Sequence, residues 1–310
     1  MKKVLLLIIL GLTGIACERG DPENEPGTLF ENQLTDGLCI SFGDSILINH
    51  EDIDYYDYST HIIYLKENHP LFQNPVDWEL GGMSFEVYSL EENIYSGVLF
   101  PAWWSSMPSG AYIQWPSFYP GYVIKIEFMS PPVYMKTDTT ADPREDERIV
   151  EALQQYGQYH QGIALELGDI QFSSSGRLSF SYTLTNEDSF DYYVLSPDKM
   201  GTGLFHYFTN GLYLYNEETG WLQHQIGVES PEPWDLWETG WLDRLNHQTS
   251  KTYRIEYDEF DQVPPGTYFF YFRFPGLTHV DQEDREGDGA LIWMGELEFS
   301  GEIKIESNLP

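Results

Sequence analysis

The sequence contains few basic residues. Of its 310 residues, 16 are Lys or Arg and 50 are Asp or Glu, which gives a formal net charge of −34 at pH 7. Binding to phosphate backbones needs a basic surface, so this balance excludes nucleic acid as a partner. It also argues against docking on anionic lipid through charge alone.

Several patterns of known function are also missing. The eight His are scattered, without a His-x-His or His-x-x-x-His pair, so the sequence excludes a catalytic zinc site. Strands and helices do not alternate in the rhythm of a parallel α/β fold. The longest apolar run lies at the N-terminus and is too short to span a membrane as a helix. Aromatic residues, in contrast, make up 16% of the chain, enough to build a core.

The N-terminus has the features of a secretion signal. Lys2 and Lys3 precede the apolar run, which ends shortly before Gly14-Ile15-Ala16-Cys17. A lone Cys after small residues resembles the lipobox of bacterial lipoproteins, although Gly14 replaces the usual large aliphatic residue. The resemblance implies cleavage of residues 1–16 and lipidation of Cys17. Ordinary secretion with cleavage elsewhere is the alternative.

Residues 17–34 form an acidic, Pro- and Gly-containing stretch that we expect to be a flexible tether. An acidic segment behind the lipidated Cys resembles the surface-export signal of Bacteroidota lipoproteins, and a plain spacer is the alternative. The resemblance implies a lipoprotein of the outer membrane, exposed at the cell surface and held to the membrane by its lipid anchor. With Cys17 lipidated, Cys39 has no disulfide partner, and its strand-like context indicates a packed, inert thiol.

Almost everything after residue 35 carries the signals of β-strands. Runs of Ile, Val, Tyr and Phe alternate with polar residues and are bounded by Gly, Pro, Asn and Asp. We expect a mostly β protein with two antiparallel sandwich-like domains, at 35–136 and 162–308. Residues 137–161 are expected to join them as a linker with one helix, since Asp142-Pro143 begins a helical pattern that Gly157 can end.

The C-terminal region resembles an immunoglobulin-like sandwich. The resemblance rests on the strand Tyr182–Thr185, which ends in the turn Asn186-Glu187-Asp188, and on Val263–Gly266, a turn that precedes an aromatic strand. This pair of features is also similar to the BsuPI-type proteinase-inhibitor domain. The resemblance implies an Ig-like fold far more than any function.

Two segments rich in aromatic residues are the candidate ligand-binding regions. The first contains Trp103, Trp104, Tyr112 and Trp115 among several prolines, which indicate loops. Aromatic rings on loops can stack on sugars or anchor a protein interface, but they can also plug a sandwich or a domain contact. In the second segment Trp234, Trp237 and Trp241 recur at helical spacing, as in an amphipathic turn or a ligand platform.

Three weaker patterns remain. Asp284, Glu286 and Asp288 resemble the first half of a calcium loop, but the acid at its twelfth position is absent, and an acidic hairpin loop between two strands is the favoured interpretation. Apart from calcium, the sequence indicates no cofactor. Asp138-Thr139-Thr140 resembles a Bacteroidota O-glycosylation site, with Thr139 as the acceptor. Gly43-Asp44-Ser45-Ile46 resembles the nucleophile block of GDS-type esterases, but no His has an Asp three residues before it, so we expect a turn.

These observations favour a lipid-anchored envelope protein that binds or adheres to a glycan or a protein, without catalysis. A proteinase inhibitor of the BsuPI-like type, presenting a rigid convex loop, is the first alternative. A glycan-active enzyme is the second, and it would need a pocket with two carboxyl groups at a suitable separation.

Overall fold

The computed structural model describes residues 33–44, 46–73, 80–129, 141–172, 176–224 and 230–306. The signal peptide, Cys17, nearly all of the tether, Ser45 and Thr139 lie outside these residues.

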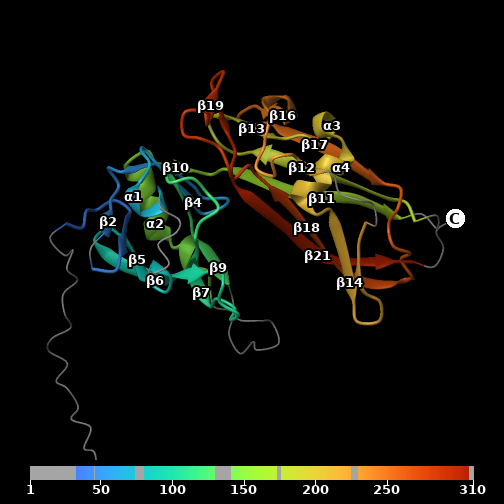
Figure 1. Cartoon of the computed structure of the whole chain (residues 1–310), viewed down its shortest axis with the longest axis horizontal. Coiled ribbons are helices and arrows are strands. Elements are labelled where there is room, and N and C mark those ends of the chain that lie inside the picture. Colours follow the sequence, from blue (N-terminus) through green and yellow to red (C-terminus); the bar gives the residue numbers. More distant parts are fainter. Residues whose placement is uncertain are drawn as a thin grey trace, which may run out of the picture.

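The described strands form five sheets (Figure 1). The first contains β2 (Ile46–Ile48), β1 (Cys39–Phe42), β5 (Ser84–Ser89), β6 (Glu92–Pro101), β7 (Gly110–Trp115) and β9 (Glu127–Met129). The second contains β10 (Tyr159–His160), β3 (Ile53–Asp57), β4 (Ile62–Leu65) and β8 (Val123–Lys125). The third contains β11 (Ile163–Phe172), β12 (Leu178–Asn186) and β17 (Ser250–Tyr257). The fourth contains β16 (Leu242–Leu245), β13 (Asp191–Leu195), β20 (Ala290–Ile292) and β19 (Glu286–Gly287). The fifth contains β15 (Gly220–Leu222), β14 (Leu212–Asn216), β18 (Gly266–Pro275) and β21 (Glu296–Ile305).

The five sheets are arranged in a ring, as in a five-bladed β-propeller. The blades are not simple meanders, because β6 pairs with β7, β3 with β10 and β13 with β20 in parallel. The expected pair of antiparallel sandwich domains, the second of them Ig-like, is therefore wrong. Alternating polar and apolar residues mark a strand and its buried face, and they are the same in both architectures; they do not specify which strands pair.

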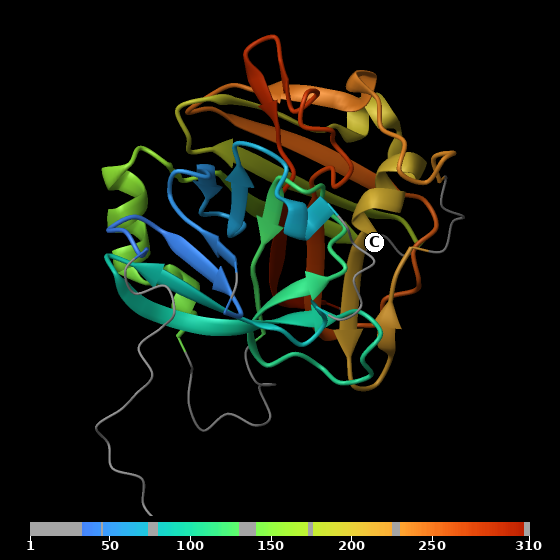
Figure 2. The ribbon, with the colours of Figure 1, turned by 60° about the vertical axis from the view of Figure 1, so that its left-hand side comes forward.

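The helices are short, and Figure 2 shows α2 at the left margin and α3 and α4 on the right-hand side. They are α1 (Pro70–Gln73), α2 (Glu147–Gln155), α3 (Pro197–Met200) and α4 (Thr202–Thr209), with 3-10 turns η3 (Pro143–Glu145) and η4 (Thr239–Trp241). The helix expected after Asp142 is confirmed in two parts. Asp142 caps η3, Asp146 caps α2, and Gly157 follows α2 with a positive φ of 67°.

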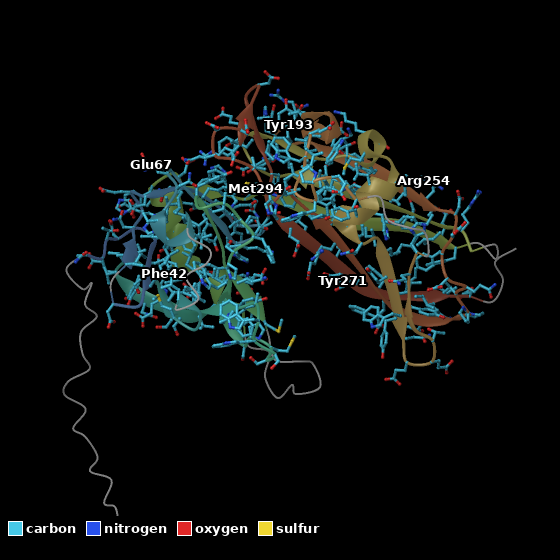
Figure 3. All side chains as sticks on the ribbon, in the orientation of Figure 1. Phe42, Glu67, Tyr193, Arg254, Tyr271 and Met294 are labelled. Atoms are coloured by element: carbon cyan, nitrogen blue, oxygen red, sulfur yellow. The ribbon has the colours of Figure 1, made fainter. Side chains whose placement is uncertain are left out.

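One continuous hydrophobic core links the sheets formed before and after residue 162. Trp293, which is 2% exposed, donates from Nε1 to Asp57 Oδ2 at 3.1 Å. The Tyr122 hydroxyl donates to Val280 O at 2.8 Å and lies 3.4 Å from the sulfur of Met294, which is labelled in Figure 3. Buried polar and apolar contacts therefore hold the two parts of the chain together.

Candidate functional site

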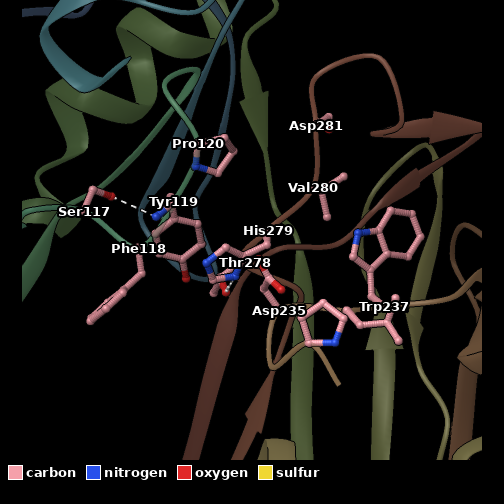
Figure 4. Close-up of a pocket in the computed structure, with 12 residues that line it drawn as sticks. Ser117, Phe118, Tyr119, Pro120, Asp235, Trp237, Thr278, His279, Val280 and Asp281 are labelled. Carbon is pink, nitrogen blue, oxygen red and sulfur yellow. Dashed lines mark hydrogen bonds between the residues drawn. The ribbon is translucent and has the colours of Figure 1, made fainter. Parts of the chain in front are cut away.

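A hollow lies between the two aromatic segments that the sequence singled out. Its volume is about 580 Å³ (Figure 4). Ser117–Pro120 form one wall, Pro233 and Asp235–Trp237 form the other, and Thr278–Asp281 lie between them. Segments more than 100 residues apart in the sequence therefore face each other across one space.

Two further hollows share lining residues with this one, and a fourth shares lining residues with one of those two. A hollow of about 250 Å³ shares Trp237 and His279 with the first and adds Arg273 and Glu296. Another, of about 210 Å³, shares Glu296 with that one and adds Lys125. A fourth, of about 400 Å³, shares Lys125 and Glu296 and extends to Tyr112. We call these four connected hollows the aromatic groove.

The first wall follows strand β7 and is anchored by a buried ring. Trp115, the last residue of β7, is 1% exposed and packs edge-on against Phe72 with ring centroids 6.2 Å apart. After it, the Ser117 hydroxyl accepts a hydrogen bond from the Tyr119 amide at 3.0 Å, which forms a tight turn. Phe118 in this turn is 59% exposed. The anchored strand end thus presents a ring to solvent at the edge of the groove.

The second wall is a loop that precedes β16. Its tight turn is closed by a hydrogen bond from the Leu236 amide to Pro233 O at 2.9 Å. Trp234 is 59% exposed and meets the His279 ring edge-on, with centroids 4.7 Å apart. Trp237 is half-buried against the core. The wall therefore combines one solvent-facing indole with one that is held in place by packing.

The middle of the groove has side chains that can form hydrogen bonds with a ligand. The Thr278 hydroxyl and His279 Nδ1 are 2.8 Å apart. Val280, next along the chain, is tied through its carbonyl to Tyr122 of the opposite part of the chain. A hydroxyl, an imidazole and the exposed carboxylate of Asp281 can thus contact a ligand between aromatic walls.

Four charged side chains of the groove form one connected group of ion pairs. Lys125 Nζ is 3.1 Å from Glu127 Oε1 and 3.4 Å from Glu296 Oε1, and Arg273 Nη1 is 3.2 Å from Glu296 Oε2. Burial disfavours the charged ammonium of Lys125, but Tyr119, Glu296 and Glu127 outweigh it and raise the lysine pKa. Burial raises the pKa of Tyr119 to about 12, so that its hydroxyl remains protonated. Two cations thus balance two carboxylates here.

The structure places the predicted aromatic candidates in different surroundings. Tyr112, Trp234 and Trp237 line the groove. Trp103 and Trp104 are each 45% exposed but line none of the four hollows. Each aromatic segment therefore contributes some of its candidate residues to the groove. Glycan binding by these residues stays a prediction.

The two remaining Trp candidates do not line the groove either. Trp115 is a core residue, and Trp241 packs edge-on against Phe208 at 6.1 Å. Trp234, Trp237 and Trp241 do not share a helix, because residues 231–238 contain only bends, a short turn and irregular chain, and Thr239–Trp241 is a 3-10 turn. The helical spacing in the sequence therefore did not reflect a helical face.

The sequence reasoning missed the charged group and the residues in the middle of the groove. Lys125 and Glu127 lie on or beside a strand that was recognised as such, and alternation along Val123–Phe128 could have indicated that both side chains lie on the same face. Nothing local in the sequence relates Arg273, Glu296 or His279 to them. These residues come together only through the packing of distant sheets.

The other candidate sites lie away from the groove. Cys39 is fully buried in β1, as expected for a packed thiol. Among the residues that the structure describes, no group of three or more His, Cys, Asp or Glu could hold a metal ion. Asp284, Glu286 and Asp288 of the hairpin before β20 form no such group, so nothing here supports the calcium hypothesis. In the described part of the chain, no helix is long and apolar enough to cross a membrane.

Comparisons with protein-family models, with curated proteins and with solved structures gave no match for this chain.

Proposed function

We propose that this chain is a lipid-anchored envelope protein that binds a glycan in the aromatic groove, without catalysis. One observation carries the proposal: two aromatic segments from distant parts of the sequence form facing walls of a single groove. The membrane anchor rests on the lipobox resemblance around Cys17, and the acidic composition of the chain leaves nucleic acid excluded as a partner.

The shape and lining of the groove favour a sugar over a protein partner. A protein interface of ordinary size is broad, with about 800 Å² buried on each side, whereas small ligands occupy concave sites with a few fixed polar groups. Phe118, Trp234 and Trp237 offer ring faces for the C–H faces of a sugar. Thr278 and Asp281 offer partners for its hydroxyl groups.

Of the five carboxylates that line the groove, Glu127 and Glu296 do not favour a glycosidase. A hydrolase of the usual kind needs one carboxylic acid that gives its proton to the leaving oxygen. Glu127 and Glu296 both contact Lys125, and Glu296 also contacts Arg273. Because Glu127 and Glu296 are engaged with cations, neither is free for that role. We propose binding alone, and the assay of reducing-end release also tests the other groove carboxylates, Asp235, Asp281 and Glu298.

The test uses the full chain carrying Cys17→Ser, so that the protein is not held in the membrane. It is screened for binding to a panel of bacterial, plant and animal polysaccharides, and any that bind are measured by calorimetry. Trp234→Ala should weaken binding by roughly 1–3 kcal/mol, the usual range for an exposed aromatic hot spot. Trp103→Ala, an exposed Trp outside the groove, is the matched control and should bind normally.

The melting temperature of each variant confirms that its fold is intact, and reducing-end release reports hydrolysis. Absence of binding to every polysaccharide, or equal binding by Trp234→Ala and Trp103→Ala, would contradict the proposal. Release of reducing ends that Glu296→Gln abolishes would establish the glycan-active enzyme instead.

A further inference from the structure

The fifth sheet carries a second aromatic surface on the face turned away from the core. Along β18, Tyr268, Phe270 and Phe272 are buried, while Phe269 and Tyr271 face outward. On the neighbouring strands β14 and β15 the outward residues include three more rings. We call this set the aromatic face: Tyr213, Tyr215, Trp221, Phe269 and Tyr271.

The rings of the aromatic face are neighbours on the sheet. In the strand register Tyr215 is opposite both Phe269 and Trp221, and Tyr213 is opposite Tyr271. The ring centroids of Trp221 lie 4.9 Å from Tyr215 and 6.2 Å from Tyr213. Trp221 is 59% exposed, Phe269 42% and Tyr215 37%. The strand backbones therefore hold a contiguous set of partly exposed rings.

The aromatic face is continuous with the aromatic groove. Arg273 follows Phe269 and Tyr271 on the same side of β18, since outward residues alternate along a strand, and Arg273 lines the groove. Tyr271, labelled in Figure 3, donates its hydroxyl to Glu298, which also lines the groove. A ligand that leaves the groove at Arg273 thus meets the rings of β18 next.

The charged residues between the groove and the aromatic face favour an uncharged polymer as the ligand. The outward side chains of β21 beside the rings are Glu298, Ser300 and Glu302, which accept hydrogen bonds. Arg273 is already paired with Glu296. In a chain with a net charge of −34, a polyanion would be repelled, whereas a hydroxyl-rich neutral chain can donate to these oxygens.

We propose that the occupant of the groove is an extended, uncharged polysaccharide whose chain continues over the aromatic face. This inference rests on the proposed function and adds the length and charge of the ligand to it. Sugar rings in the groove supply the first contacts, and successive sugar units stack on Tyr271, Phe269 and Trp221. Affinity should therefore increase with chain length beyond what the groove alone can hold.

The experiment measures affinity as a function of chain length. The probes are neutral oligosaccharides of two to eight sugar units from the cello-, manno- and xylo- series, together with their parent polysaccharides and the polyanion polygalacturonate. The wild-type protein should bind an oligosaccharide of eight sugar units about tenfold more tightly than one of three units. Polygalacturonate should not bind.

Variants separate the face from the groove. Trp221→Ala/Phe269→Ala should remove the dependence on length while trimer binding stays unchanged, whereas Trp234→Ala should weaken trimer and octamer alike. Tyr215→Ser serves as the second face variant if the double variant does not fold, and Trp103→Ala is again the control.

Equal affinity for all chain lengths, or a length dependence that survives Trp221→Ala/Phe269→Ala, would overturn this inference while leaving groove binding intact. Tight binding of polygalacturonate would contradict the inference that the ligand is uncharged. If none of the neutral or acidic glycans binds, the proposed function itself fails. Sedimentation is measured in parallel, and self-association that Trp221→Ala/Phe269→Ala abolishes would assign the face to a second copy of the chain.

Discussion

The carboxyl group of Asp57 gives the sharpest test of the structure, because it is buried at the contact between the two parts of the chain. It is 1% exposed and accepts hydrogen bonds from the Ser59 amide, the Ser59 hydroxyl and Trp293 Nε1. Burial nevertheless dominates and raises its pKa from 3.8 to about 6. We change it by Asp57→Asn, which keeps the shape and removes the charge.

The sign of the effect follows from proton binding. The folded state binds its proton up to about pH 6, whereas the unfolded state releases it near pH 3.8, so stability falls as the pH rises between these values. One pKa unit corresponds to about 1.36 kcal/mol, so the full cost above pH 6 is about 3 kcal/mol. Asp57→Asn does not carry this cost, and it should gain stability over the wild type as the pH rises.

Urea unfolding at pH 5 and pH 8 provides the measurement, because both values avoid the pI of about 4.2 where solubility is lowest. Over this interval the free energy of unfolding of Asp57→Asn, minus that of the wild type, should increase by about 1.4 kcal/mol. The lost hydrogen-bond acceptor changes the free energy of unfolding of Asp57→Asn by the same amount at pH 5 and at pH 8. It therefore does not affect the difference between the two pH values. Glu151→Gln, at an exposed position of α2, is the control and should parallel the wild type. A parallel Asp57→Asn curve would show that Asp57 is not buried as the structure places it.

Three further predictions follow from the same structure. Cys17→Ser should abolish labelling by radioactive palmitate and retention in the membrane fraction, and equal labelling would contradict lipidation. Trp115→Ala should lower the free energy of unfolding by about 3–5 kcal/mol in urea titrations, whereas Trp103→Ala should change it by less than about 1 kcal/mol, because only the first ring is in the core. A fragment of residues 162–308 should melt below the intact chain, since Trp293 loses its buried hydrogen-bond partner Asp57 there; an unchanged midpoint would contradict the continuous core.

The strands could be predicted from the sequence because their signal is local. Leu178–Leu184 and Thr267–Phe274 alternate between buried and outward residues, and both are strands in the structure. The α2 region was also recognisable, since Asp142 and Pro143 are residues that begin helical turns. Alternation does not encode sheet order, however. The parallel pairing of β3 with β10 joins residues about 100 positions apart, and no local pattern marks it.

Only a small part of the candidate site could be predicted from the sequence. Composition drew attention to Tyr112, Trp234 and Trp237, which line the groove, but it gave equal weight to Trp115, which is buried. Whether a ring in a Pro-rich segment faces water depends on the strand that precedes it. The outward rings of β18 were missed because a strand with aromatics on both faces shows no polar alternation.

The contacts between the two parts of the chain also bear on how the groove would bind. The two walls of the groove belong to different parts of the sequence, and a hinge between them would let the groove open and close. Two contacts oppose such a hinge. Tyr122 contributes to the core of the first wall and donates to Val280 in the middle of the groove, while Lys125 is paired with Glu296 across it. Ligand binding then costs little ordering of the protein, since the walls are already in position. If the proposed glycan binds there, its contacts can therefore be added without a change in the shape of the groove.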